Sequence, residues 1–299
     1  MPDQTRFSEL SVAEKCAIER LCRATGHSSP HDAIVARAQA LLAEHGQLDT
    51  PFEPEKMACL QRITRVDRTD ITFDACLLPT SEGFRVEVCK YHPRGRQTFS
   101  IAHEIGHTFL IEFEPTLGEA RRETGISSSA NSNLVEKLCD RAATELIWPT
   151  HTFQRDVWQT GPSLNAVLKL ASKYKASVTA TARRFAEIGL WRCAFVIWER
   201  ECTTENQTTM RPRVISKSEC APFIRSDQIT TPEDSGLYVV WHSDQIIRGK
   251  DIFSAGGRRF YSESIKLGSS VLSMIIFEPY AEILAAKEPQ REQQTLFRT

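Results

Sequence analysis

Residues 99–113 place apolar side chains on one helical face and two histidines four positions apart. The stretch FSIAHEIGHTFL contains His103, Glu104 and His107. Residues four apart lie about one turn apart on the same side of a helix, so both imidazoles can bind one metal ion. Glu104 lies beside them, where a carboxylate can act as general base toward an attacking water. The pattern therefore predicts a helix that carries part of a hydrolytic metal site.

A catalytic zinc ion needs a third protein ligand. The extended motif HExxHxxGxxH does not supply it, because Leu110 and Phe113 stand where that motif has Gly and His. A second predicted helix offers two acidic residues one turn apart instead, Glu136 and Asp140. We predict that Glu136 binds the metal and that Asp140 accepts the free ring N–H of His103, which fixes the tautomer of that ring.

The residues alone leave structural alternatives open. The two histidines can be ordinary residues of a helix face. Glu136 can be only the capping-box partner of Asn133 at the start of the predicted helix 134–148, and Asp140 can be an acid on a helix surface. Other nearby acids are rival ligands with poorer placement: Glu112, Glu114, Glu119 and Glu123.

The two motifs taken together, AHEIGH followed by ExxCDRAATELIWP, resemble those of the ImmA/IrrE family of metallo-endopeptidases, AHELGH and then ExxANRFAAELLMP. The resemblance covers about residues 30–150. It implies a compact, gluzincin-like zinc-peptidase domain with helices and a small mixed sheet. It also implies that His103, His107 and Glu136 bind Zn²⁺ and that Glu104 is the general base.

Family members typically cut a helix-turn-helix repressor and so release genes for DNA-damage response, mobile-element transfer or anti-phage defence. The resemblance therefore implies a repressor of this kind as the partner and substrate. Two positions depart from the family pattern, Cys139 where Ala is common and Ala142 where many members carry Phe. We expect both to be packing positions that leave the chemistry intact.

A predicted strand, 83–91, precedes the motif helix and alternates apolar with polar residues. In zinc peptidases of this general type, an edge strand beside the active-site helix holds the substrate backbone in extended form. We assign this role to residues 83–91, although plain sheet structure fits the alternation equally well. Tyr91 and His92, at the end of the strand, are candidates to donate hydrogen bonds to the oxyanion of the tetrahedral intermediate.

Cys89 lies on the same strand, on the face that also carries Arg85 and Glu87. A thiolate is a better zinc ligand than water, so a cysteine that lines the cleft can occupy the fourth metal position and inhibit the enzyme. The alternative is a simple unpaired thiol within a sheet.

Residues 151–192 include a stretch, 163–190, with the spacing of a helix-turn-helix and a break near 175–177. From Arg155 to Arg192 there are seven basic residues and two acidic ones. Such a segment can contact DNA phosphates. A separate candidate activator, single-stranded or damaged DNA or else a small ligand, would be sensed by the C-terminal region 193–299. The alternative is that these helices only brace the peptidase domain.

Residues 193–299 change to a strand-rich pattern. Apolar runs at 193–198, 236–242, 258–267 and 271–277 predict strands separated by polar loops. This region loosely resembles the GAF-like sensor domain that some family members carry. We therefore expect an α+β protein with three parts: a peptidase domain (1–150), a helix-turn-helix-like segment (151–192) and a GAF-like domain (193–299) that gates the peptidase.

Composition excludes several other classes of protein. The 37 basic residues nearly balance the 38 acidic ones, so the whole chain has no general attraction to nucleic acid or an anionic membrane. No apolar run is long enough to predict a membrane span, and we expect no signal peptide. Nine scattered cysteines without a CxxC pair indicate reduced thiols in the cytoplasm.

These observations together predict a cytoplasmic zinc endopeptidase that cleaves a repressor and is not associated with a membrane. The competing hypothesis is a non-proteolytic, DNA-binding regulator whose zinc site is structural or vestigial. A structural zinc site needs no general base and usually has four protein ligands, so the presence of Glu104 favours the enzyme.

Overall fold

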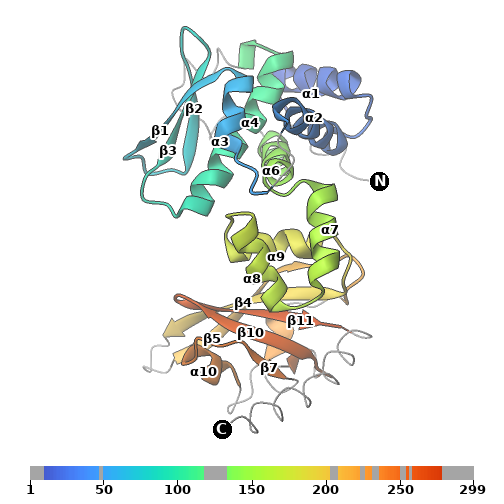
Figure 1. The fold of residues 1–299 in the computed structure, drawn as a ribbon, viewed down its shortest axis with the longest axis vertical. Coiled ribbons are helices and arrows are strands. Elements are labelled where there is room, and N and C mark those ends of the chain that lie inside the picture. Colours follow the sequence, from blue (N-terminus) through green and yellow to red (C-terminus); the bar gives the residue numbers. More distant parts are fainter. Residues whose placement is uncertain are drawn as a thin grey trace. The chain divides into compact units, whose positions relative to one another are not determined.

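The computed structural model describes residues 10–46, 50–117, 133–202, 208–222, 226–230, 236–249, 254–255 and 258–277. The chain divides into two compact units, each with helices and a sheet of its own (Figure 1). The first unit lies within residues 1–152 and includes residues 173–177. The second consists of residues from 153–172 and 178–299. The fold is therefore mixed α+β, and no helix in the described ranges is long and apolar enough to cross a membrane.

The first unit begins with two helices, α1 (Val12–Thr25) and α2 (Pro30–His45). Ser11 starts α1 as the first residue of a capping box, which satisfies backbone N–H groups at the helix end. Gly26 and Gly46 follow the two helices in the left-handed conformation, with φ of 73° and 70°. Glycine adopts this conformation without steric cost, so each helix ends at its glycine.

The sheet of the first unit has three strands, β1 (Ile63–Thr69), β2 (Ala75–Pro79) and β3 (Phe84–Cys89). Their order is β1-β3-β2, with β3 parallel to β1 and antiparallel to β2. The prediction that residues 83–91 form an edge strand is therefore wrong. A tight turn pairs β3 with β2, and β1 pairs with its other side, so both edges of β3 are occupied. β2 is an edge strand instead.

Two helices of the first unit pack against each other, α4 (Arg94–Phe113) and α6 (Asn133–Ile147). They correspond to the helices that the sequence predicted over 99–113 and 134–148. α4 starts five residues earlier than expected, directly after Pro93. It packs on β2 and β3 and also contacts α1 and α2, so it runs through the middle of the unit (Figure 1). The short helix α3 (Pro54–Met57) also contacts it.

Three helices follow, α7 (Thr150–Thr160), α8 (Leu164–Lys173) and α9 (Val178–Glu187). The two helices predicted within 163–189, with a break near 175–177, are confirmed as α8 and α9, whereas α7 was not predicted. Within the second unit, the buried carboxylate of Glu263 accepts a hydrogen bond of 2.6 Å from the backbone N–H of Leu164, at the start of α8.

The main sheet of the second unit is antiparallel, with the strand order β5-β4-β11-β10-β7. The strands are β4 (Cys193–Cys202), β5 (Thr208–Lys217), β7 (Ile247–Gly249), β10 (Tyr261–Leu267) and β11 (Ser270–Ile276). The runs at 193–198 and 271–277 were predicted as strands and correspond to β4 and β11. β5 was not predicted; it contains Pro212, which cannot donate a hydrogen bond to a partner strand. β5 lies at the edge of the sheet, where a proline is accommodated because one side of the strand has no partner among the described strands of this sheet.

The run 236–242 is a helix rather than the predicted strand. It forms α10 (Gly236–Trp241), with Leu237 and Val240 fully buried and Tyr238 and Val239 about half exposed. Buried residues three positions apart are typical of a helix. The sequence of a short apolar run does not show whether the run forms a helix or a strand.

The predicted strand 258–267 is divided into β9 (Arg258–Arg259) and β10. The remaining short strands are β6 (Ile229–Thr230) and β8 (Ser254–Ala255), which pair with β9 in the order β6-β8-β9.

Candidate metal centre

The close packing of α4 on α6 depends on Gly106, which lies between the two histidines of the motif. A Cβ atom at this position would lie 2.9 Å from the Cα of Cys139 and 3.2 Å from the Cβ of Ala142. Contacts that short are not tolerated between real Cβ and backbone atoms, so any other residue would push the helices apart. The glycine therefore allows α6 to bring its acidic side chains to the imidazoles of α4.

Glu136 faces both histidines. Its Oε2 lies 3.0 Å from Nε2 of His103, and its Oε1 lies 3.6 Å from Nε2 of His107. The two imidazole rings are 5.0 Å apart, centre to centre. Two imidazole nitrogens thus face one carboxylate, and residues of these types make a donor set that suits a catalytic zinc ion.

The other nitrogen of His103 is held by Asp140, whose Oδ1 lies 2.9 Å from Nδ1. Burial of the ring disfavours its charged form, but the hydrogen bonds with Asp140 and Glu136 outweigh burial and raise the pKa of His103 to about 10. The surroundings of this ring therefore favour positive charge. A metal cation at Nε2 would take the place of the proton there, which is consistent with a cation site.

Glu104 lies in the same cleft as the histidines and is 4% exposed. The cleft has a volume of about 310 Å³. Its walls come from the start of β2 with the residues before it, from α4 and from α6. They consist of Phe73, Asp74, Ala75, Phe99, Ser100, His103, Glu104, His107, Glu136 and Asp140. All five residues that the sequence proposed for metal binding, base catalysis and histidine orientation are therefore brought together.

The two oxyanion candidates lie outside the set of residues that line this cleft. Tyr91 is 68% exposed, and its hydroxyl donates a hydrogen bond of 3.0 Å to Asp70. Nδ1 of His92 lies 3.2 Å from Oδ1 of Asp74, and Asp74 is a wall residue of the cleft. Their role in the reaction stays a prediction.

Cys89 differs from its expected place, and Cys139 makes a contact beyond the packing that was expected of it. Cys89 is buried at the end of β3, where its N–H donates to the carbonyl of Asp74, and it does not line the cleft. Cys139, which we assigned to packing, is fully buried with its Sγ 3.3 Å from Nδ1 of His107. The sequence held one signal of this contact: Cys139 lies three residues after Glu136, on the same face of α6.

Cys139 also introduces a rival ligand set. His103, His107 and Cys139 can each place one ligand atom within 4.8 Å of the others. The two candidate third ligands lie at different nitrogens: Glu136 faces Nε2 of both rings, whereas Cys139 lies at the Nδ1 side of His107. The two nitrogens of an imidazole point away from each other, so one metal ion cannot use both sides of the ring.

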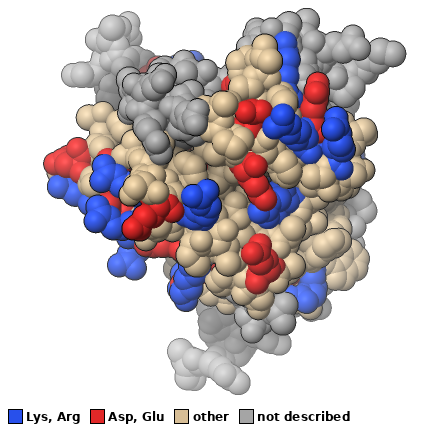
Figure 2. Space-filling model, turned by 90° about the horizontal axis from the view of Figure 1, so that it is seen from above, with Lys and Arg blue, Asp and Glu red and all other residues tan. Residues whose placement is uncertain are grey.

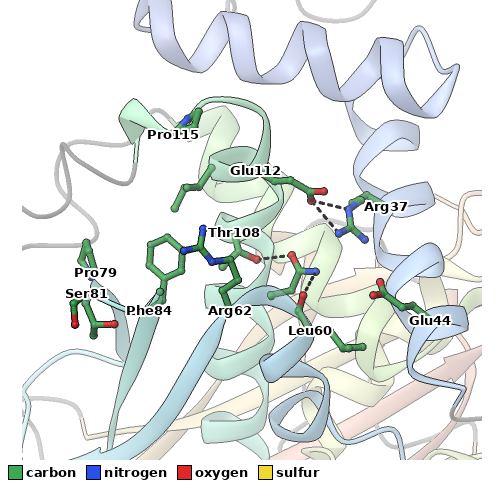
Figure 3. Close-up of a pocket in the computed structure, with 14 residues that line it drawn as sticks. Arg37, Glu44, Leu60, Arg62, Pro79, Ser81, Phe84, Thr108, Glu112 and Pro115 are labelled. Atoms are coloured by element: carbon green, nitrogen blue, oxygen red, sulfur yellow. Dashed lines mark hydrogen bonds and ion pairs between the residues drawn. The ribbon is translucent and has the colours of Figure 1, made fainter.

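A second, larger cleft lies at another face of α4 (Figure 3). Its volume is about 580 Å³, and its walls include Arg37, Thr108, Glu112 and the turn between β2 and β3. Arg37 and Glu112 are ion-paired across it at 2.9 Å (Figure 3). Its lining residues include carboxylates but neither histidine nor cysteine. Of these two clefts, only the smaller one is lined by histidines.

Comparison with known proteins finds a peptidase family in the part of the chain that carries these residues. Residues 80–186 match the family model of the IrrE N-terminal-like domain, a peptidase domain, and the match includes α4 and α6. The radiation response metalloprotease IrrE of Deinococcus deserti is 28% identical to this chain over 92 residues. Residues 80–186 belong to the ImmA/IrrE family. The match to the Deinococcus protein covers 31% of this chain and 32% of that protein, so the chain spans about a third of the length of this relative.

The solved structure of a transcriptional regulator of Mycobacterium tuberculosis is similar to this chain over a longer stretch than residues 80–186. It covers 90% of this chain and 96% of its own, with a TM-score of 0.52 and 13% sequence identity. At this identity the similarity concerns the fold alone.

Proposed function

We propose that this protein is a zinc-dependent endopeptidase in which His103, His107 and Glu136 hold the metal. The observation that carries the proposal is the position of Glu136, whose two oxygens face Nε2 of both histidines at 3.0 and 3.6 Å. Glu104 lines the same cleft. The family match supports a metallopeptidase domain, and the gluzincin-like organisation of the first unit is part of this proposal.

In the reaction, Glu104 takes a proton from the attacking water and later delivers it to the leaving amine, so that it ends each cycle unprotonated. Zinc, when bound, supplies Lewis-acid chemistry that polarises the scissile carbonyl and makes water a better nucleophile. Asp140 holds the Nδ1–H of His103 and so keeps Nε2 directed at the metal position.

The substrate is proposed to be an extended segment of a partner protein with an apolar side chain at the cleft. Two aromatic side chains, Phe73 and Phe99, line the cleft beside the histidines, and Phe73 is 44% exposed. β2, an edge strand whose first residue lines the cleft, replaces β3 as the element expected to guide the substrate backbone.

The partner is proposed to be a helix-turn-helix repressor whose cleavage derepresses stress, DNA-damage or phage-defence genes in the cytoplasm. The similarity to a protein named as a radiation response metalloprotease supports a role in stress. The second unit, with its five-stranded antiparallel sheet, is proposed as a GAF-like domain that gates the peptidase.

DNA, single-stranded or damaged, or a small ligand is proposed as the signal that the GAF-like domain senses. Separately, the basic segment 151–192, with α8, α9 and most of α7, is proposed to contact DNA phosphates. On the face of the molecule shown in Figure 2, Lys and Arg side chains lie among Asp and Glu side chains. That face fits the nearly balanced charge of the chain, so an interaction with DNA would depend on a local group of basic residues.

A non-proteolytic regulator is the second candidate function, because the Mycobacterium tuberculosis protein with a similar fold is a transcriptional regulator. In such a protein the metal site would be structural or vestigial. The buried carboxylate of Glu104 in the histidine cleft favours the enzyme, since a structural metal site has no use for a base.

The test is co-expression with the helix-turn-helix protein that is encoded nearest to this one, with and without DNA damage, followed by intact-mass spectrometry. Wild type is compared with Glu104→Gln, and Glu112→Gln serves as the control. Glu112 lies on the same helix but faces the other cleft. We expect a new fragment with wild type and the control but not with Glu104→Gln. A bound zinc ion without any fragment under either condition would favour the regulator.

A further inference from the structure

We propose that Cys139 is a positioning residue for His107: its sulfur holds the Nδ1 nitrogen of that ring and so directs Nε2 toward the metal position. The inference rests on the proposed function, because metal binding gives the orientation of Nε2 its purpose. It assigns a chemical role to a side chain that the sequence pattern placed among packing residues.

The geometry around His107 places sulfur and carboxylate at different nitrogens. Sγ of Cys139 lies 3.3 Å from Nδ1, and Oε1 of Glu136 lies 3.6 Å from Nε2. Both His107 and Cys139 are almost completely buried, at 4% and 0% exposure. A ring confined in this way keeps the orientation that its two contacts define.

The same arrangement occurs at the other histidine. Nδ1 of His103 lies 2.9 Å from Asp140, and Nε2 of the same ring lies 3.0 Å from Glu136. Consecutive residues of α6, Cys139 and Asp140, thus each contact the Nδ1 of one imidazole. Glu136, about one turn earlier, faces the Nε2 atoms of both.

A neutral imidazole carries one N–H, which can be at either nitrogen. If sulfur accepts a hydrogen bond from Nδ1–H, Nε2 keeps its lone pair and can bind a metal. If the proton sits on Nε2 instead, that nitrogen cannot bind a metal. Acceptance by Cys139 therefore stabilises the tautomer that metal binding needs. Sulfur is a weak acceptor, so we expect its effect to be smaller than that of the Asp140 carboxylate on His103.

The short distance between the helices explains why a cysteine can do this. Gly106 brings α4 so near to α6 that an added Cβ would lie 2.9 Å from the Cα of Cys139. At this separation a side chain with one heavy atom beyond Cβ reaches the ring of His107. Alanine at position 139 would have no atom to make the contact.

The experiment uses the full-length protein and three variants: Cys139→Ala, Cys139→Ser and, as a control, Cys76→Ala. Cys76 is another buried thiol of the first unit, on β2, and it does not line the metal cleft. Histidine-selective ¹⁵N NMR of the metal-free proteins reports the tautomer of His107. Competition with a chromophoric chelator gives the zinc dissociation constant.

We expect the Nδ1–H tautomer of His107 in wild type and in Cys76→Ala, and a mixture of tautomers in Cys139→Ala. Zinc affinity should fall about tenfold in Cys139→Ala, the lower end of the range for losing a group that orients a metal ligand. Cys139→Ser keeps an acceptor and should recover part of the loss. An unchanged tautomer together with unchanged zinc affinity in Cys139→Ala would overturn the proposal.

Cobalt substitution separates positioning from direct ligation. A thiolate bound to Co²⁺ gives an intense charge-transfer band in the near ultraviolet, so we expect no such band in the cobalt-loaded wild type. A band that disappears in Cys139→Ala would show that sulfur is a ligand and would overturn the proposal. These measurements need no substrate, so a failure to find repressor cleavage would leave the role of Cys139 fully testable.

Discussion

Asp140 and His103 form a 2.9 Å contact through Oδ1 and Nδ1, and the other nitrogen of the same ring faces Glu136 at 3.0 Å. The imidazole is thus held between two carboxylates that come from one helix. The two acids have different roles in the proposed enzyme, because only Glu136 also faces His107. Asp140 is more exposed than Glu136 and acts through the ring that it holds.

Replacing Asp140 by Asn tests this division of roles. The amide cannot carry the negative charge that favours a proton on His103, so the pKa of His103 in the metal-free protein should fall from its raised value of about 10. Zinc affinity should fall by about 10- to 100-fold, while the ligands remain in place. NMR titration of the ring and chelator competition measure the two effects. A variant that binds zinc as tightly as wild type would contradict the role of Asp140.

Gly106→Ala should destabilise the first unit despite the better helix propensity of alanine. The gain in propensity is about 1 kcal/mol, whereas overpacking against the backbone of a neighbouring helix costs about 1–3 kcal/mol. The added Cβ would meet the Cα of Cys139 at 2.9 Å, and backbone atoms cannot rotate away. Urea unfolding should show a lower midpoint, and zinc affinity should also fall as α6 moves away from α4. A more stable variant would show that the helices can separate without cost.

The sequence predicted which side chains would lie together in the proposed metal centre, because that prediction depends on local spacing. His103 and His107 share a face by helical periodicity, and the pattern around Glu136 identifies the partner helix. The contact of Cys139 with His107 was not predictable, since it depends on how closely two helices approach. Only the combination of Gly106 and the packing of α6 establishes that distance.

The errors in the fold have similar causes. The pairing order β1-β3-β2 is a long-range property, so alternation within 83–91 identified a strand but not its central place. α10 was mistaken for a strand because a run of six residues is too short to show its period. Two of the rival ligands lie outside the described residues, Glu119 and Glu123. The side chain of Asn133, the proposed capping residue, is also outside what the structure describes.

The second unit should lose stability at alkaline pH through Cys193. Burial of this thiol raises its pKa to about 12, with the nearby Cys220 adding to the shift, against 9.0 for a solvated thiol. Above pH 9 the unfolded chain releases this proton and the folded chain keeps it, so unfolding becomes more favourable as pH rises toward 12. The slope for one proton is about 1.4 kcal/mol per pH unit. Cys193→Ala should be less sensitive to pH between 8 and 10.5 in urea unfolding. An equal slope in both proteins would assign the effect to other groups.

The aromatic wall of the metal cleft should determine which peptides are cleaved. Phe73 is 44% exposed beside the histidines, and removing a ring that contacts an apolar substrate side chain costs about 1.5–3 kcal/mol of binding. We therefore expect Phe73→Ala to raise KM by about tenfold or more, with little change in kcat, because Phe73 lies outside the proposed catalytic groups.

The measurement for Phe73→Ala uses peptides that span the cleavage site of the partner protein once its position is known. Substituting the apolar residue of the peptide by alanine should raise KM for wild type but hardly affect the Phe73→Ala enzyme, because the two changes remove the same contact. Tyr238→Ala, which removes an exposed aromatic ring of the second unit, is the control and should leave KM unchanged. Additive effects of the peptide and enzyme changes would show that Phe73 does not contact that residue.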